Sequence, residues 1–381
     1  MTGAAELPLH GGKVPGWMLR LMERMGEAIL DSLVELKGPE AVRRGLADPV
    51  WFQAFNNIIG MDWDSSGSTT VLMGVLKSIT WRRPDLGLLV LGGKGRHMRG
   101  VPGEAVEASK LLDVDPERIK FFSKATARAD SVFLQDGYDL YHHAVVVDEG
   151  GGMIVVQQGM NVERGMARRY HLDRAVIEEP HTGVAGAKGI ALNATARESR
   201  EARALFIDLL NDDARRIAKL LAEANAMLRR QPSLTDFLTG KPGSKGIYDR
   251  YRVYKPIPPD PRLIKAIENI ARNPPTSEEE LITAPSLGPK VIRALALIAD
   301  LIYSTPVSTR DPVTHPLNPY IYAYAVGGKD GIPYRYDPKT AVKTIETLED
   351  ALNHARIGDK ERLRAIMRLR RLIRGGPRGR Y

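Results

Sequence analysis

Residues 276–303 constrain the fold more than any other segment, because they read as a helix, a tight turn and a second helix. Ser277 suits the cap of the first helix, and the three glutamates after it suit the positive end of a helix. Pro285 ends that helix, since proline cannot continue a helix interior. Gly288 is expected to supply backbone freedom in the turn, and Pro289 begins the second helix, where its missing N–H costs nothing. The segment therefore predicts a helical hairpin.

The turn of this hairpin is a candidate phosphate-binding site, because turn amides and a helix N-terminus face outward together beside Lys290. The segment resembles the helix-hairpin-helix element of DNA repair and recombination proteins, which reads apolar, Pro, Gly, apolar, Gly and then a polar or basic residue. Ser286 stands in place of the first Gly. The resemblance implies a grip on the DNA backbone without sequence reading; an ordinary helical hairpin is the alternative. The expected DNA contacts in the hairpin are Leu287, Gly288, Lys290 and Arg293.

The C-terminal residues 359–381 carry most of the net charge of +9. They hold nine Lys or Arg side chains against two acidic ones, a net +7, so the rest of the chain is nearly neutral. A basic amphipathic helix with such a tail can follow a phosphate backbone, and a solvated helix is the alternative. Arg368, Arg371 and Arg374 are the expected DNA contacts in this segment.

Composition excludes several classes of protein. The 381 residues suffice for two or three domains with a real core. The chain has no cysteine, which excludes disulfides, zinc–thiolate sites and cysteine nucleophiles. No apolar run approaches ~18 residues and no signal peptide is recognisable, so we expect a cytoplasmic protein without a membrane partner. Abundant arginine and proline would suit a thermophile. The sequence leaves the oligomeric state open, and a homodimer is one alternative.

The apolar pattern changes character near residue 196. Before it, a buried strand at Leu86–Leu91, a short strand at Ser131–Leu134 and a β-hairpin over residues 144–157 alternate with helical stretches. After it, helical spacing dominates. The predicted fold is an α/β or α+β domain over residues 1–195, an all-α helix-hairpin-helix domain over 196–303, and a loop with basic helices over 304–381.

Polar motifs cluster in the first half of the chain, and one more follows near the C-terminus. They are Leu7-Pro8-Leu9-His10-Gly11-Gly12-Lys13, Asp62-Trp63-Asp64-Ser65-Ser66-Gly67, Gly92-Gly93-Lys94-Gly95, Asp136-Gly137-Tyr138 through His143, Gln157-Gln158-Gly159-Met160-Asn161, Arg169-Tyr170-His171, Glu179-Pro180-His181 and Gly327-Gly328-Lys329-Asp330-Gly331. Together with the hairpin, these motifs resemble one family of unknown function, domain family 763, of archaea and bacteria. The resemblance covers nearly the whole chain and implies no activity.

These motifs predict a site for phosphodiester hydrolysis, as in a nuclease or DNA repair enzyme. Asp136 and His142 are the candidate ligands of a Mg²⁺ or Mn²⁺ ion that would activate water. Metal-free acid–base catalysis by one histidine and one carboxylate is the alternative. His142 and His143 should point to opposite faces of a strand, so at most one of them joins a given site. The further catalytic candidates are Asp62, His171 and Glu179, and the phosphate-binding candidates are Lys94, Arg168 and Arg169.

Two other functions stay open. Lys290 and Asp311 have the spacing of the nucleophile and acid of helix-hairpin-helix DNA glycosylases and abasic-site lyases, although Pro312 follows where that pattern leads into a helix. A DNA-binding accessory protein without catalysis is the other alternative. The hairpin does not by itself distinguish DNA from RNA.

Overall fold

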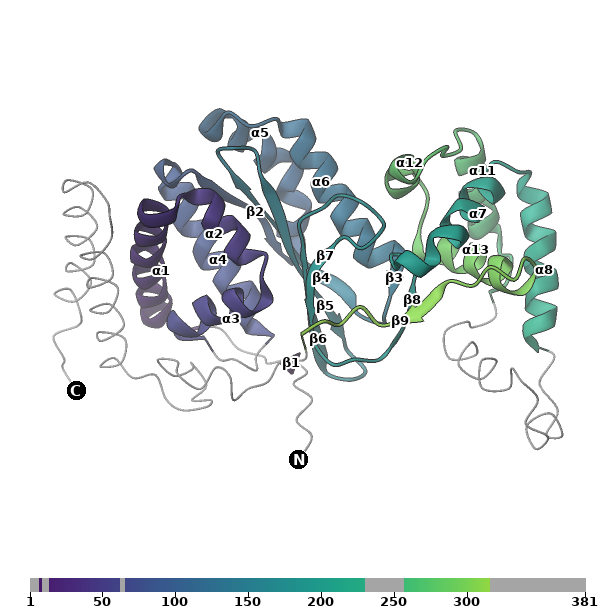
Figure 1. Ribbon diagram of the computed structural model, residues 1–381, viewed down its shortest axis with the longest axis horizontal. Helices are drawn as coiled ribbons and strands as arrows, with labels where there is room; N and C mark the ends of the chain where they lie inside the picture. Colours follow the sequence, from purple (N-terminus) through teal and green to yellow (C-terminus); the bar gives the residue numbers. More distant parts are fainter. Residues whose placement is uncertain (1–6, 9–13, 62–65, 230–256, 316–381) are drawn as a thin grey trace.

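The computed structural model describes residues 7–8, 14–61, 66–229 and 257–315, which form a mixture of helices and sheets (Figure 1). Asp62, Arg368, Arg371 and Arg374 lie outside the described residues, as do most of residues 304–381.

An antiparallel sheet forms the centre of the first half of the chain. Its strands are β1 (Leu7–Pro8), β2 (Leu88–Lys94), β4 (Asp139–Asp148), β5 (Met153–Asn161), β6 (Met166–Leu172) and β7 (His181–Ala185). They run in the order β1-β6-β5-β4-β2, and β7 also pairs with β6. The predicted hairpin is confirmed, since β4 and β5 pair from Asp139 opposite Met160 to Val147 opposite Met153.

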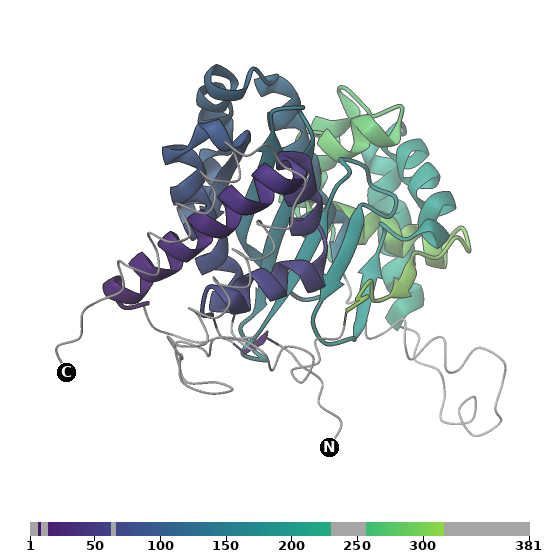
Figure 2. The same cartoon turned by 60° about the vertical axis from the view of Figure 1, so that its left-hand side comes forward.

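Helices cover both faces of this sheet (Figures 1 and 2). One face carries α1 (Gly16–Lys37), α2 (Pro39–Leu46), α3 (Pro49–Ile58) and α4 (Gly67–Arg82), and the other carries α5 (Val101–Leu112) and α6 (Pro116–Arg128). Strand residues alternate between the two cores: Ala144 packs with α1–α4, whereas Val145 packs with α5 and α6. We call these the α1–α4 face and the α5–α6 face.

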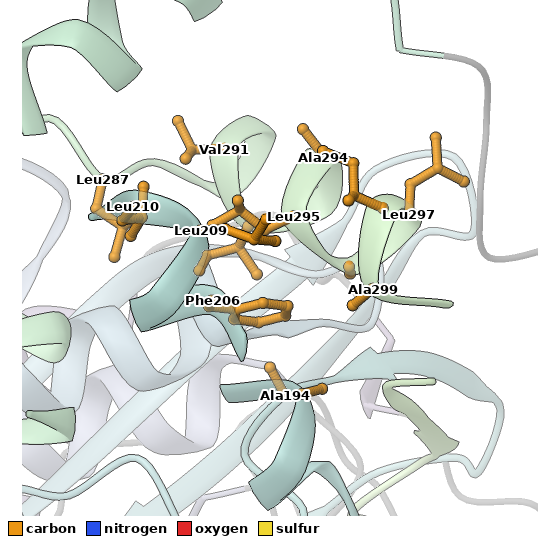
Figure 3. Packing of buried hydrophobic residues seen from close by; sticks show 14 of the residues in the cluster. Ala194, Phe206, Leu209, Leu210, Leu287, Val291, Ala294, Leu295, Leu297 and Ala299 are labelled. Atoms are coloured by element: carbon orange, nitrogen blue, oxygen red, sulfur yellow. The ribbon is translucent and has the colours of Figure 1, made fainter. Parts of the chain in front are cut away.

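The second helical group packs around Phe206, Leu209 and Leu295 (Figure 3). It consists of α7 (Arg200–Leu210), α8 (Ala214–Arg229), α11 (Pro261–Ala271), α12 (Glu278–Thr283) and α13 (Pro289–Leu301). A small sheet, β3 (Leu134–Gln135), β8 (Ile190–Asn193) and β9 (Ser308–Arg310), lies beside it. Phe133 and Leu192 belong to the same core. Hydrophobic packing thus continues across residue 196, and the domain boundary there stays a prediction.

The expected strand at residues 131–134 is largely wrong. Ala129–Phe133 instead continues α6 as one π-helical turn, and the strand is limited to Leu134–Gln135. Tertiary contacts explain the difference, because the π-helical turn directs Asp130 inward, where it hydrogen-bonds to Gln157 and His181.

Candidate functional site

The sheet separates the polar candidates into two groups. His142 and His143 follow each other on β4 and point to opposite faces, as the strand alternation predicts. His143 bonds to Ser123 of α6, whereas Gln158, which lies opposite His142 on β5, donates to the carbonyl of Ser66 at the start of α4. The two histidines therefore belong to different environments.

On the α5–α6 face, five side chains form a continuous chain of hydrogen bonds. His143 Nε2 lies 2.8 Å from Ser123 Oγ, and His143 Nδ1 lies 2.7 Å from Gln157 Oε1. Gln157 Nε2 donates to Asp130 Oδ2 at 2.6 Å, and His181 Nε2 lies 2.6 Å from Asp130 Oδ1. Burial lowers the pKa of His143, more than the Gln157 bond and the nearby Asp130 raise it. The arrangement joins a hydroxyl, two imidazoles and a carboxylate, which are groups that carry out acid–base chemistry.

A buried ion-pair cluster lies at the end of β6. Arg168 donates to Asp136 Oδ2 at 2.7 Å and to Asp311 Oδ2 at 2.9 Å, and all three side chains are at most 2% exposed. Tyr170 donates to the same Asp136 oxygen at 2.7 Å, and the Arg168 guanidinium lies 4.5 Å from the ring centroid of Tyr138. Burial raises the pKa of Asp136 against the lowering effect of Arg168. Because both carboxylates hold Arg168, this arginine is a neutralising partner rather than an open phosphate ligand.

The α1–α4 face carries a second polar layer, centred on three neighbouring strands. Gln158 Nε2 donates to Tyr141 Oη at 2.7 Å. Arg169 donates to Gln53 of α3 at 3.1 Å, and its guanidinium lies 4.5 Å from the ring centroid of Phe52. Lys94 pairs with His142 along β2 and β4 and lies exposed at the outer end of this layer. Of the three predicted phosphate ligands, Lys94 and Arg169 therefore share a face that Arg168 does not.

Apart from Arg169, eight buried side-chain atoms of this layer have no hydrogen-bond partner among the described residues. They are both amide atoms of Asn56, the hydroxyls of Ser68 and Thr69, both ring nitrogens of His142, Oε1 of Gln158 and Nε2 of His171. Buried polar groups in folded proteins are nearly always hydrogen-bonded to protein, water or ligand. Ordered water or a polar ligand would satisfy these atoms.

The two histidines of this layer are held neutral. Burial lowers the pKa of His142 to about 3, with His143 and Lys94 adding to the effect. Burial also lowers the pKa of His171 far below its usual value, with Arg169 as the next cause. His171 Nδ1 lies 2.9 Å from the carbonyl of Leu46, so it carries the ring proton and leaves Nε2 as a lone-pair acceptor.

The predicted hairpin is present as α12, a short turn and α13, but its glycine plays a different part. Gly288 has φ −109°, which any residue adopts, and a Cβ built there meets nothing within 4 Å. The left-handed residue is Ser286, with φ 64°. The expectation that Gly288 supplies backbone freedom is therefore wrong, and its missing side chain leaves open space in front of α13.

The inner side of the turn is bound to the rest of the molecule. Arg128 donates to the carbonyls of Ile282 and Leu287, and Gln135 Nε2 donates to the carbonyl of Pro289 at 2.9 Å. Arg293 donates to Gln135 Oε1, so this predicted DNA contact lies on the inner side. Leu287, a second one, is buried at 1% exposure, whereas Ser286, Pro289 and Lys290 remain exposed.

Several predicted partnerships are not formed. Lys290 pairs with Asp260, the cap of α11, whereas Asp311 pairs with Arg168, so the described contacts do not join the two lyase candidates. Asp136 bonds to side chains of the α5–α6 face and His142 lies on the other, so they do not form the expected metal pair. No group of three metal-binding side chains occurs within the described residues.

Glu179 also lies apart from the other catalytic candidates. It accepts from the backbone of Arg197 and from Arg310, at 3.1 and 2.9 Å. The sequence interpretation missed Ser123, Asp130, Asn56, Ser68 and Thr69. Asp130 follows the strongly charged helix α6, so no local sequence signal distinguishes it from an exposed carboxylate.

Family comparison supports the resemblance drawn from the motifs. A family model described as a protein of unknown function (DUF763) matches residues 3–336. The chain belongs to the DUF763 family. No curated protein and no solved structure matches the chain. Among the described residues of this DUF763 protein, no helix is long and apolar enough to cross a membrane.

Proposed function

We propose that this DUF763 protein binds the phosphate backbone of DNA with the α12–α13 turn. The observation that carries the proposal is the exposed N-terminus of α13, where Lys290 stands beside a glycine whose missing Cβ leaves open space. Ser286 adopts the left-handed conformation at the position where the helix-hairpin-helix pattern has glycine. The basic segment 359–381 would add phosphate contacts that depend on salt.

The bonds on the inner side of the turn support this proposal. Arg128 and Gln135 hold the turn carbonyls from behind, so the exposed tip is fixed before a ligand arrives. A preorganised site loses less conformational entropy on binding than a flexible one. The neighbouring Asp260 would give up its ion pair with Lys290 when a phosphate replaces it.

The experiment is a salt titration of binding to a labelled duplex, with single-stranded DNA and RNA as parallel ligands. Lys290→Gln is expected to weaken duplex binding several-fold and to reduce the salt slope by about one unit, because one phosphate contact is lost. The matched control is Lys110→Gln, which removes a somewhat more exposed, ion-paired lysine from α5. Equal effects of the two variants would show a general charge effect and would contradict phosphate binding at the α12–α13 turn.

Gly288→Ala separates geometry from charge. The conformation at this residue accepts a methyl group, so stability should change by less than about 1 kcal/mol. The methyl would occupy the space in front of α13, and duplex binding should weaken as in Lys290→Gln. Unchanged binding in this variant would count against contact at the helix N-terminus.

A second proposal is hydrolysis of phosphodiester bonds by metal-free acid–base catalysis. Its observation is the contact of 2.6 Å between His181 and Asp130, which can orient an imidazole as a general base. Asp130→Asn should abolish product formation on nicked, single-stranded or duplex DNA without changing duplex affinity. Binding without product in the wild-type protein, with and without Mg²⁺ or Mn²⁺, would leave an accessory DNA-binding protein.

The lyase alternative has a separate readout. It requires Lys290 to form a covalent adduct with abasic DNA on borohydride treatment. The adduct should disappear in Lys290→Ala and persist in Asp130→Asn. Absence of an adduct in the wild-type protein removes this alternative and leaves backbone binding untouched.

A further inference from the structure

The polar layer on the α1–α4 face lies at the beginning of helix α4. Gln158 contacts the carbonyl of Ser66, the residue before α4, at 3.0 Å. The first N–H groups of a helix have no partner within the helix, and they favour negative charge. The layer therefore combines a positive helix end with unpartnered side chains.

Helical periodicity places Thr69 over the sheet. Thr80 Oγ1 accepts from the backbone of Val90 on β2 at 3.3 Å, so this stripe of α4 faces the sheet. Thr69 lies on the same stripe three turns earlier, about 16 Å along the helix axis. Lys94 and His142 lie about 13 Å from Val90 in the same direction along the strands. Thr69 therefore lies at the same level along the sheet as the paired residues Lys94 and His142.

Buried polar groups of α3 and α4, together with two cations of the same face, have the chemistry of an anion site. Ser68, Thr69 and Asn56 are fully buried and offer hydroxyl and amide donors without a partner among the described residues. Arg169 and Lys94 bring positive charge.

We propose that a phosphate group binds beside the first turn of α4, with Thr69 and His142 on the sheet side and with Ser68 and Asn56 on the side of α3. Neutral His142 donates one N–H to a phosphate oxygen, and the hydroxyls and the Asn56 amide donate to the others. This site is separate from the α12–α13 turn and does not depend on it. The same chemistry suits free phosphate and the terminal phosphate of a nucleic acid.

The test is calorimetric titration of phosphate-free protein with inorganic phosphate, with chloride at equal ionic strength as the reference. Wild-type protein should bind phosphate with saturation and should show a phosphate-dependent rise in Tm. Ser68→Ala and Thr69→Val should each weaken phosphate binding about tenfold or more, because each removes a hydrogen bond to a charged group. Thr80→Val is the matched control, and its Kd should equal that of the wild type.

Three results would overturn the proposal. They are no saturable phosphate effect in the wild type, wild-type affinity in both Ser68→Ala and Thr69→Val, and equal weakening in Thr80→Val. The first would mean that the layer holds water. Ser68→Ala removes a single oxygen, so it serves as the test where Thr69→Val fails to fold.

Competition identifies the source of the phosphate. Displacement of inorganic phosphate by a 5′-phosphorylated oligonucleotide, and not by its unphosphorylated form, would assign the site to nucleic-acid ends. Binding of inorganic phosphate without competition by either would assign it to the free ion. Lys290→Gln should leave the phosphate Kd unchanged, so failure at the α12–α13 turn and failure at α4 are distinguishable.

Discussion

The two faces of the central sheet contain similar polar residues, but these residues differ in how completely they are hydrogen-bonded. On the α5–α6 face, hydrogen bonds connect Ser123, His143, Gln157, Asp130 and His181 without interruption. On the α1–α4 face, eight buried side-chain atoms lack a partner among the described residues. Buried polar residues that hydrogen-bond to one another stabilise a single packing arrangement. Buried polar residues without hydrogen bonds lower the stability of the fold unless water or a ligand bonds to them. The phosphate site that we propose belongs to the α1–α4 face.

The largest expected effect is a loss of stability when the buried ion pairs on the α5–α6 face are broken. Arg168→Met leaves two buried carboxylates without their cation. It should lower the free energy of unfolding by about 3–5 kcal/mol, measured by urea denaturation. Adding Asp136→Asn and Asp311→Asn removes those charges and should restore part of the loss. A cost below about 1 kcal/mol for Arg168→Met alone would show that water already solvates the cluster.

The next effect concerns pH and the α1–α4 face. Burial lowers the folded-state pKa of His142 to about 3, against an ordinary value of 6.5, so the unfolded chain binds the proton more readily. Stability from this group is present above the unfolded pKa and is lost as pH falls through the window between these two values. One pKa unit corresponds to about 1.4 kcal/mol, which sets an upper limit of about 4–5 kcal/mol.

His142→Gln is the variant that checks this prediction by urea unfolding from about pH 7 to about pH 4. The loss of stability on acidification should become shallower, though not vanish, because burial lowers the pKa of His143 and His171 as well. His97→Gln changes an exposed histidine and should leave the profile unchanged. An unchanged profile in His142→Gln would place water around its ring and weaken the contrast between the faces.

The smallest effect compares two buried threonines directly. Thr126 of α6 donates to the carbonyl of Phe122 at 2.7 Å, whereas the hydroxyl of Thr69 has no described partner. In phosphate-free buffer, Thr126→Val should cost about 1 kcal/mol and Thr69→Val less than about 0.5 kcal/mol, since only the first variant loses a hydrogen bond. Equal losses of unfolding free energy in the two variants, measured by chemical denaturation, would show that the Thr69 hydroxyl already has a hydrogen-bond partner.

Local sequence patterns determined much of the framework. The β-hairpin, the helix beginning at Pro289, and the opposite directions of His142 and His143 follow from short-range periodicity and capping. The same reasoning failed at residues 131–134, where β-propensity favours a strand but bonds to Asp130 favour a π-helical turn. It also misplaced the special backbone conformation of the hairpin turn, which falls on Ser286.

The sequence by itself determined which polar residues are unusual, and only the tertiary structure decided which of them meet. Asp136 and Asp311 are far apart in sequence, yet both hold Arg168. Lys290 and Asp311 have a suggestive spacing, yet each has another partner. Spacing along a chain constrains contacts within one element, whereas contacts between elements depend on how the hydrophobic faces of helices and strands pack. That packing closed the polar network beneath α6 and left open the one beneath α4.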